Sequence, residues 1–127
     1  MKSKSNVPLP LTGKDVIHQY FRCIDNKDVQ GALELFDYDA VLHEPFSNLG
    51  ELRGRSAIEP FIKVALMANS TLRREISIEK NDKNPDMITA LVTFEKGDIL
   101  KGRFTFEFTP DNHQPGGKKI KSLRIEF

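Results

Sequence analysis

The sequence predicts an α+β domain in which helices come first along the chain and an antiparallel sheet follows. Through most of the first half, apolar residues recur three and four positions apart, which is the spacing of one face of a helix. After residue 69 the period changes to two, which is typical of strands that are buried on one face. The length of 127 residues suits one domain with one hydrophobic core.

Three helices are predicted from their apolar spacing and from their capping residues. A capping-box pattern at residues 12–15 opens the first helix, which ends near Asn26. Asp28 is expected to cap a second helix, which would form a hairpin with the first. Ser56, with Glu59 three residues later, is expected to cap the third helix.

Four segments with alternating apolar and polar residues predict an antiparallel meander, with a tight turn at residues 96–98. One face of this sheet is apolar and must be covered by the helices. The other face carries threonine, arginine and glutamate, and is either solvated or paired with a second subunit. The four segments are residues 72–79, 87–95, 99–108 and 119–127. The apolar face carries Ala90, Val92, Phe94, Phe104, Phe106, Phe108, Leu123, Ile125 and Phe127.

The balance of charge and the single cysteine exclude several classes of protein. With 19 basic and 18 acidic residues the net charge is +1, so the chain lacks the basic surface that nucleic-acid binding requires. Cys23 is alone, so no disulfide can form within the chain, and its place in an apolar helical pattern indicates a core residue. Because no phosphate-binding loop or metal-ligand motif is present, neither a cofactor nor a metal is expected.

A soluble, cytoplasmic protein is expected from the ends and the hydropathy of the chain. No apolar stretch approaches the ~20 residues of a membrane span, and the first residues lack the apolar segment of a secretory signal. Residues 1–11 are polar and then broken by two prolines, which indicates a flexible arm. The remaining residues, 12–127, form the single domain.

The strongest functional candidate lies in the stretch ALELFDYDAVLHEPF, residues 32–46. A helical pattern that runs to Phe36 gives way to an alternation from Ala40 to Glu44, which places Leu42 and Glu44 on one side of a short strand. A carboxyl group that faces a phenylalanine-rich interior is desolvated, which favours its neutral form and suits a general acid or base. The alternative is that Glu44 ends the strand with its tip in water.

The order of several motifs resembles that of the ketosteroid isomerases and of the wider nuclear-transport-factor-two-like superfamily, which includes the SnoaL-like polyketide cyclases. Each motif is loose, but their order and spacing extend over about residues 14–127. The matching elements are Tyr20 in the first helix, Asn26-Lys27-Asp28, Leu35-Phe36, Asp39-Ala40, Glu44-Pro45 and the run 53–58 before the third helix.

The resemblance implies a cystatin-like cone, in which a strongly curved, mostly antiparallel sheet wraps around the three helices and leaves a cavity at its open end. By position in the motif, Glu44 takes the role of the general base, and Tyr20 that of a hydrogen-bond donor to the substrate oxygen. The position of a second donor holds Phe104, which cannot donate. The residues expected to line the pocket are Phe21, Phe36, Phe61, Val92, Phe94, Phe104, Phe106, Leu123 and Ile125.

Two functions remain open at this point. The first is a cofactor-independent enzyme of the isomerase or cyclase type, acting on an apolar carbonyl-containing or polyketide-like molecule. The second is a non-catalytic module for association or ligand carriage, which forms a homodimer through the outer face of the sheet. A cavity of ~300 Å³ or more that opens at Glu44 favours a ligand, whereas a core filled by phenylalanine favours the second function.

Overall fold

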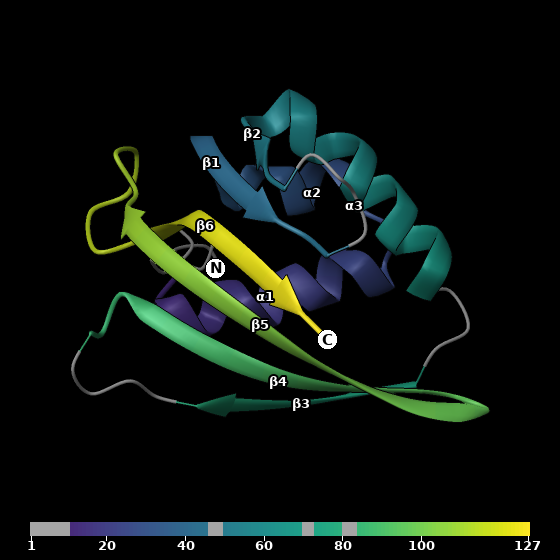
Figure 1. The fold of residues 1–127 in the computed structure, drawn as a ribbon. Coiled ribbons are helices and arrows are strands. Elements are labelled where there is room, and N and C mark those ends of the chain that lie inside the picture. Colours follow the sequence, from purple (N-terminus) through teal and green to yellow (C-terminus); the bar gives the residue numbers. More distant parts are fainter. Residues whose placement is uncertain (1–10, 46–49, 70–72, 80–83) are drawn as a thin grey trace, which may run out of the picture.

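Three helices cover one side of a six-stranded sheet in the computed structural model, which describes residues 11–45, 50–69, 73–79 and 84–127 (Figure 1). The α+β class predicted from the sequence is confirmed. The helices are α1 (Gly13–Asp25), α2 (Val29–Glu34) and α3 (Arg55–Asn69). The strands are β1 (Phe36–His43), β2 (Leu52–Arg53), β3 (Arg73–Glu79), β4 (Met87–Lys96), β5 (Asp98–Pro110) and β6 (Lys118–Glu126).

The strand order of the open sheet is β2-β1-β6-β5-β4-β3. The four strands from β3 to β6 form the predicted antiparallel meander, and they twist strongly across α1 (Figure 1). An unpredicted feature is the parallel pairing of β1 with β6, in which His43 lies opposite Arg124. This pairing places Glu44, the residue after β1, beside the end of β6.

Helix α1 begins and ends as its sequence predicts. The Thr12 N–H donates to the Asp15 carboxylate (3.1 Å), and the Asp15 N–H donates to the Thr12 hydroxyl (3.3 Å), which completes the capping box. The Thr12 hydroxyl also donates to the Asp15 carboxylate (2.9 Å), and this hydrogen bond, together with that from the Thr12 N–H, holds the pKa of the Asp15 carboxyl below its ordinary value. Cys23 lies on the buried face, and burial raises the pKa of its thiol, in keeping with a core residue.

The predicted end of the second helix is wrong, because α2 ends at Glu34 and Phe36 already belongs to β1. The apolar spacing of the helix continues to Phe36 because this residue is buried, and the spacing alone does not show whether a buried residue belongs to a helix or to a strand. In the structure the backbone at Leu35 and Phe36 is bonded elsewhere. The Ile120 N–H of β6 donates to the Leu35 carbonyl (2.8 Å), and the Arg55 guanidinium donates to the Phe36 carbonyl (2.6 Å from Nη2).

The predicted cap of the third helix is also wrong. Helix α3 begins at Arg55, so Ser56 lies within its first turn instead of preceding the helix as its cap. Gly54 has a φ of +87°, a conformation that glycine adopts without strain. Its N–H donates to the Ala40 carbonyl (2.8 Å), and its carbonyl accepts from the Ile58 N–H (3.1 Å). The contact of Gly54 with β1 therefore fixes the start of α3 directly after Gly54, so a cap formed by Ser56 and Glu59 is not used.

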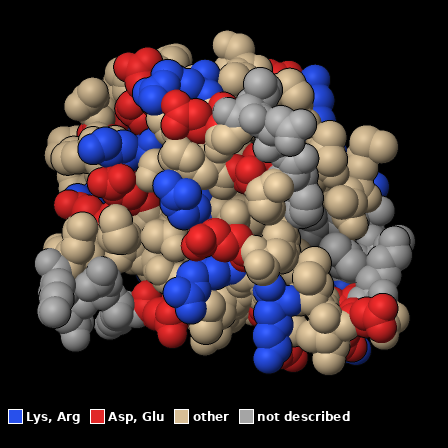
Figure 2. All heavy atoms as spheres, in the orientation of Figure 1, with Lys and Arg blue, Asp and Glu red and all other residues tan. Residues whose placement is uncertain are grey.

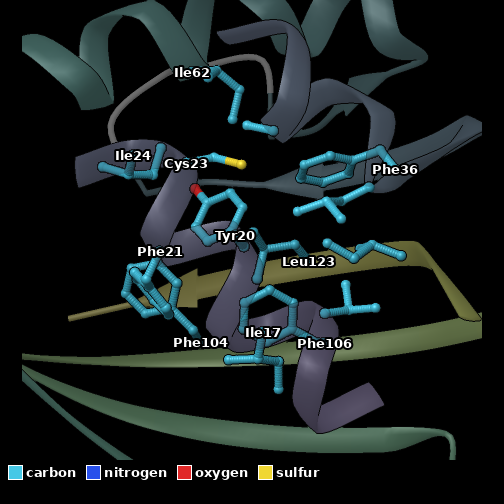
Figure 3. Close-up of a cluster of buried hydrophobic side chains, with 14 of the residues drawn as sticks. Ile17, Tyr20, Phe21, Cys23, Ile24, Phe36, Ile62, Phe104, Phe106 and Leu123 are labelled. Carbon is cyan, nitrogen blue, oxygen red and sulfur yellow. The ribbon is translucent and has the colours of Figure 1, made fainter. Parts of the chain in front are cut away.

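The core lies between α1 and the inner face of the sheet. The Tyr20 ring meets the rings of Phe36 and Phe106 edge to face, with centroids 6.1 and 5.9 Å apart (Figure 3). The apolar face of the sheet is buried as predicted, except at Phe127, which is 49% exposed. In the described parts of the chain, no helix combines the length and the apolar character that a membrane crossing requires.

Candidate functional site

A cavity of about 810 Å³ lies between α1, α3 and the inner face of β4, β5 and β6. Its volume falls within the range of roughly 300–1,000 Å³ that is usual for small-molecule sites. Its wall is almost wholly apolar, and among the described residues only Tyr20, Glu44 and Asp98 bring polar side chains to it.

The mouth of the cavity is marked by apolar side chains that are well exposed to solvent. They are Val64 of α3 (63% exposed), Leu100 near the β4–β5 hairpin (51%) and Phe127 at the C-terminus (49%). These three parts of the chain lie on the same side of the molecule (Figure 1). Gly102 leaves room for the Phe127 ring, because a Cβ atom there would lie 2.9 Å from it.

Glu44 reaches the cavity because side chains alternate along β1. Leu42 is fully buried on the inner side, and Glu44, two residues later, borders the cavity and is half-buried. His43 points the other way, where its Nδ1 lies 3.9 Å from the Glu51 carboxylate. The strand thus delivers a carboxylate to an apolar chamber, as the period of two in the sequence suggests.

Tyr20 borders the same cavity from the buried face of α1 and is only 2% exposed. Its oxygen points toward the end of α1 that carries Ile24, away from Phe106 and Leu123 (Figure 3). Among the described residues its hydroxyl has no hydrogen-bond partner. Burial raises the pKa of the Tyr20 phenol well above its ordinary value, although the positive charge of Arg74 opposes this effect. The phenol therefore stays protonated at neutral pH and is available as a donor.

Arg74 lies behind this part of the wall, on the inner side of β3. Its side chain is 7% exposed, and its Nη2 lies 2.5 Å from the Asp25 carboxylate and 3.4 Å from the Phe21 carbonyl. Its guanidinium carbon lies 5.2 Å from the centre of the Phe21 ring. Arg74 thus joins the end of α1 to the sheet and places a positive charge near Tyr20.

Asp98 is a residue of the cavity that the sequence did not single out. It is exposed and begins β5 directly after Gly97, whose φ is +79°. The sequence predicts only a tight turn there, and aspartate is common in turns for local reasons. No signal in the sequence distinguishes this aspartate from an ordinary turn residue.

The side chains expected to line the pocket fall into two groups in the structure. Those that border the cavity are Phe21, Phe61, Phe94, Phe104 and Ile125. Those that lie in the packed core, away from the cavity wall, are Phe36, Val92, Phe106 and Leu123, each at most 1% exposed. The second group is buried in the cluster that α1 covers, so these four residues support the cavity without bordering it.

A second, polar hollow of about 420 Å³ lies on the outer face of the sheet. Its wall includes His43, Glu51, Arg53, Glu107 and Arg124. Figure 2 shows basic and acidic side chains interleaved on the face where β5 and β6 lie toward the viewer. The described residues include no group of three or more His, Cys, Asp or Glu side chains arranged to hold a metal ion.

The model of the SnoaL-like domain family matches residues 17–121 of the chain. A search of curated protein sequences gives no match. Many solved structures share the fold, and some of them are described as nuclear-transport-factor-two-like or as having a cystatin-like fold.

Three solved structures illustrate the range of proteins with this fold. SalBIII, an epoxide hydrolase/cyclase-like enzyme with a role in pyran ring formation in the polyether salinomycin, is 18% identical (TM-score 0.69; 88% of this chain and 87% of that chain). A proposed polyketide cyclase from Sinorhizobium meliloti is 18% identical (0.66; 98% and 100%). A proposed association domain of calcium/calmodulin-dependent protein kinase type II from Thiobacillus denitrificans is 10% identical (0.71; 94% and 97%). At these identities the likeness shows the fold alone.

Proposed function

Because this chain belongs to the SnoaL-like family, we propose that it binds an apolar, carbonyl-containing molecule in the cavity and moves a proton within it. The observation that carries the proposal is that Glu44, directly after β1, and Tyr20 of α1 border the same apolar chamber. A carboxylate and a protonated phenol are the base and the donor that enolisation requires. No cofactor takes part in this chemistry.

The proposed step begins with the Glu44 carboxylate taking a proton from the carbon beside the substrate carbonyl. The electron pair of the broken C–H bond forms a carbon–carbon double bond, and the carbonyl π electrons move to the oxygen. The Tyr20 hydroxyl donates a hydrogen bond to the negative charge that develops there. If the substrate is a β,γ-unsaturated carbonyl compound, the protonated Glu44 then returns the proton to the γ carbon of the dienolate, which gives the conjugated isomer. In a cyclase, the enolate carbon instead attacks a second carbonyl of the substrate, and Glu44 gives its proton to the alkoxide that forms as the ring closes.

The composition of the wall supports an apolar substrate for this reaction. Phe21, Phe61, Phe94 and Phe104 surround the chamber with rings that exclude water and strengthen electrostatic interactions inside it. Two of the solved structures with this fold are described as cyclases or cyclase-like. In the proposed reaction, isomerisation and ring closure through an enolate both begin with the proton transfer assigned to Glu44.

Hydrogen–deuterium exchange tests this function without knowledge of the natural substrate. We expect the protein to catalyse the incorporation of deuterium from D₂O at the carbon beside the carbonyl of at least one apolar cyclic ketone. The incorporation is measured by NMR and mass spectrometry. Ala68→Trp should slow the exchange markedly, because Ala68 borders the cavity on its exposed side and a large ring there obstructs the entry of the ketone. Lys63→Trp, on the exposed side of the same helix, is the matched control and should exchange normally. Equal rates in wild type and Ala68→Trp would contradict the proposal.

The outer face of the sheet favours a second candidate function, association with another copy of the chain. Its polar hollow mixes acidic and basic side chains, a composition that allows the surface to pair with a second copy of itself across a two-fold axis. One of the solved structures with this fold is described as an association domain. This function needs no ligand and is compatible with catalysis inside the cavity.

Sedimentation velocity tests the association. We expect a dimer at micromolar concentration that dissociates as the salt concentration rises, because charged groups form the interface. Arg124→Glu, in the outer hollow, should shift the equilibrium to monomer. Lys63→Glu makes the same charge change on α3 and should leave the dimer intact. A monomer at tens of micromolar protein in low salt would eliminate this candidate.

A further inference from the structure

The charged side chains that border the cavity are all acidic among the described residues. Glu44 and Asp98 border it, and the described residues of its wall include no lysine, arginine or histidine. Arg74 is a buried cation near the cavity, but it lies behind the Phe21 ring rather than in the wall. At the described part of the wall, a ligand therefore meets two carboxylates and no cation that could act as a counterion for a negative charge of its own.

The polar groups are ordered from the bottom of the cavity to its mouth. Tyr20 is at the bottom, since it is almost fully buried, and so are its neighbour Phe21 and the Phe104 ring that Phe21 contacts. Glu44 is half-buried. It directly follows His43, which pairs with Arg124, so Glu44 lies near the buried Ile125 of β6. Asp98 is exposed and lies two residues from Leu100, at the mouth.

The two ends of the cavity consequently prefer different chemical groups. At the bottom, the unpartnered Tyr20 hydroxyl and the charge of Arg74 behind Phe21 favour an oxygen that accepts a hydrogen bond. At the mouth, the Asp98 carboxylate favours a cation. The rings of Phe94 and Phe127, with centroids 6.1 Å apart, border the same cavity and add aromatic surface on which a cation is also stabilised.

We propose that the ligand is an apolar molecule with two unlike ends, an uncharged oxygen acceptor that meets Tyr20 and a basic amine that lies at the mouth beside Asp98. This inference rests on the ligand-binding part of the proposed function and not on catalysis. It assigns Asp98 as a specificity-determining residue. It also disfavours ligands whose outer end is a carboxylate, because that group would lie near Asp98 and the described residues of the cavity wall include no cation to pair with it.

Three probes that differ only at one end test the inference. Each is a 2-acetylnaphthalene, whose ketone can accept from Tyr20, and the 6-position carries an aminomethyl, a hydroxymethyl or a carboxylate group. Dissociation constants are measured by ligand fluorescence at pH 7 and low salt. We expect the amine to bind about threefold more tightly than the alcohol, since Asp98 is exposed and its attraction is screened. The carboxylate should bind at least about tenfold more weakly than the alcohol.

Two charge-removing variants identify the groups responsible. Asp98→Asn should reduce the affinity for the amine probe to that for the alcohol probe. Glu44→Gln should reduce the difference in dissociation constant between the carboxylate probe and the alcohol probe. Glu126→Gln removes an exposed carboxylate at the end of β6, away from the cavity wall, and should change none of the three affinities.

The outcomes separate this inference from the proposed function. If the carboxylate binds as tightly as the amine, or if Asp98→Asn keeps the preference for the amine, the inference is overturned while the cavity remains a ligand site. If none of the three probes binds to wild type, both the inference and the proposed ligand site fall.

Discussion

Glu44→Gln is expected to slow deuterium exchange into a bound ketone by about 10²–10⁴-fold, which is the contribution typical of a positioned general base. Glutamine has nearly the same shape as glutamate, so the cavity should keep its volume. Its amide has no basic oxygen that could accept a proton from carbon. NMR rates measured at saturating ketone separate this loss of chemistry from any change in binding.

Glu51→Gln is the matched control for this variant. Glu51 lies on the other side of β1, where it pairs with Arg53 at 3.0 Å and approaches His43. The control should exchange at the wild-type rate. If Glu44→Gln retained a rate within about threefold of wild type, Glu44 would not be the base, and Asp98 would be the remaining carboxylate of the described cavity wall.

Most of the fold could be predicted because period and capping are local properties of the sequence. The alternation along β4, β5 and β6 identified the buried face, and the capping box at Thr12 identified the start of α1. The parallel pairing of β1 with β6 could not be predicted in the same way. It joins residues about 80 positions apart, as in the pair Leu42 and Leu123, and nothing in either segment specifies its partner.

The cavity could be predicted only in part, because periodicity gives the face of a side chain and not its depth. Phe104 and Phe106 occupy the same face of β5, yet Phe104 borders the cavity whereas Phe106 lies in the packed core. The difference depends on which part of α1 lies over each ring. Tyr20 contacts Phe106 and Phe21 contacts Phe104, and α1 ends soon afterwards at Asp25.

Arg74 is an arginine among the apolar residues of β3, in a pattern visible in the sequence itself. An arginine on the apolar face of a strand needs a partner, because a buried charge without one is strongly destabilising. The structure supplies Asp25 and the Phe21 carbonyl at the end of α1. The same contacts hold the end of α1, the helix that carries Tyr20, whereas the sequence pattern indicates only that Arg74 needs a partner and not which one.

Tyr20→Phe is expected to lower the rate of exchange by about 10²–10³-fold, the usual cost of losing one donor to a developing oxyanion. The ring remains in place between Phe36 and Phe106, so the packing of α1 should be preserved. Tyr38→Phe is the control, since Tyr38 is 71% exposed and lies outside the described cavity wall. A Tyr20→Phe variant with full activity would mean that another group, or water, binds the substrate oxygen.

The stability of Tyr20→Phe at alkaline pH tests independently whether the phenol is a buried, protonated donor. Because the folded state raises the pKa of Tyr20, the unfolded chain releases this proton first, at about pH 10. The stabilisation due to the neutral buried phenol is therefore fully present below pH 10 and declines as the pH rises further. Wild type should lose free energy of unfolding above pH 10 more steeply than Tyr20→Phe, by about 1.4 kcal/mol per pH unit in urea titrations. Equal slopes for the two proteins would show that the phenol ionises as readily in the folded state as in the unfolded chain, and Tyr20 would then lose its assignment as the buried donor.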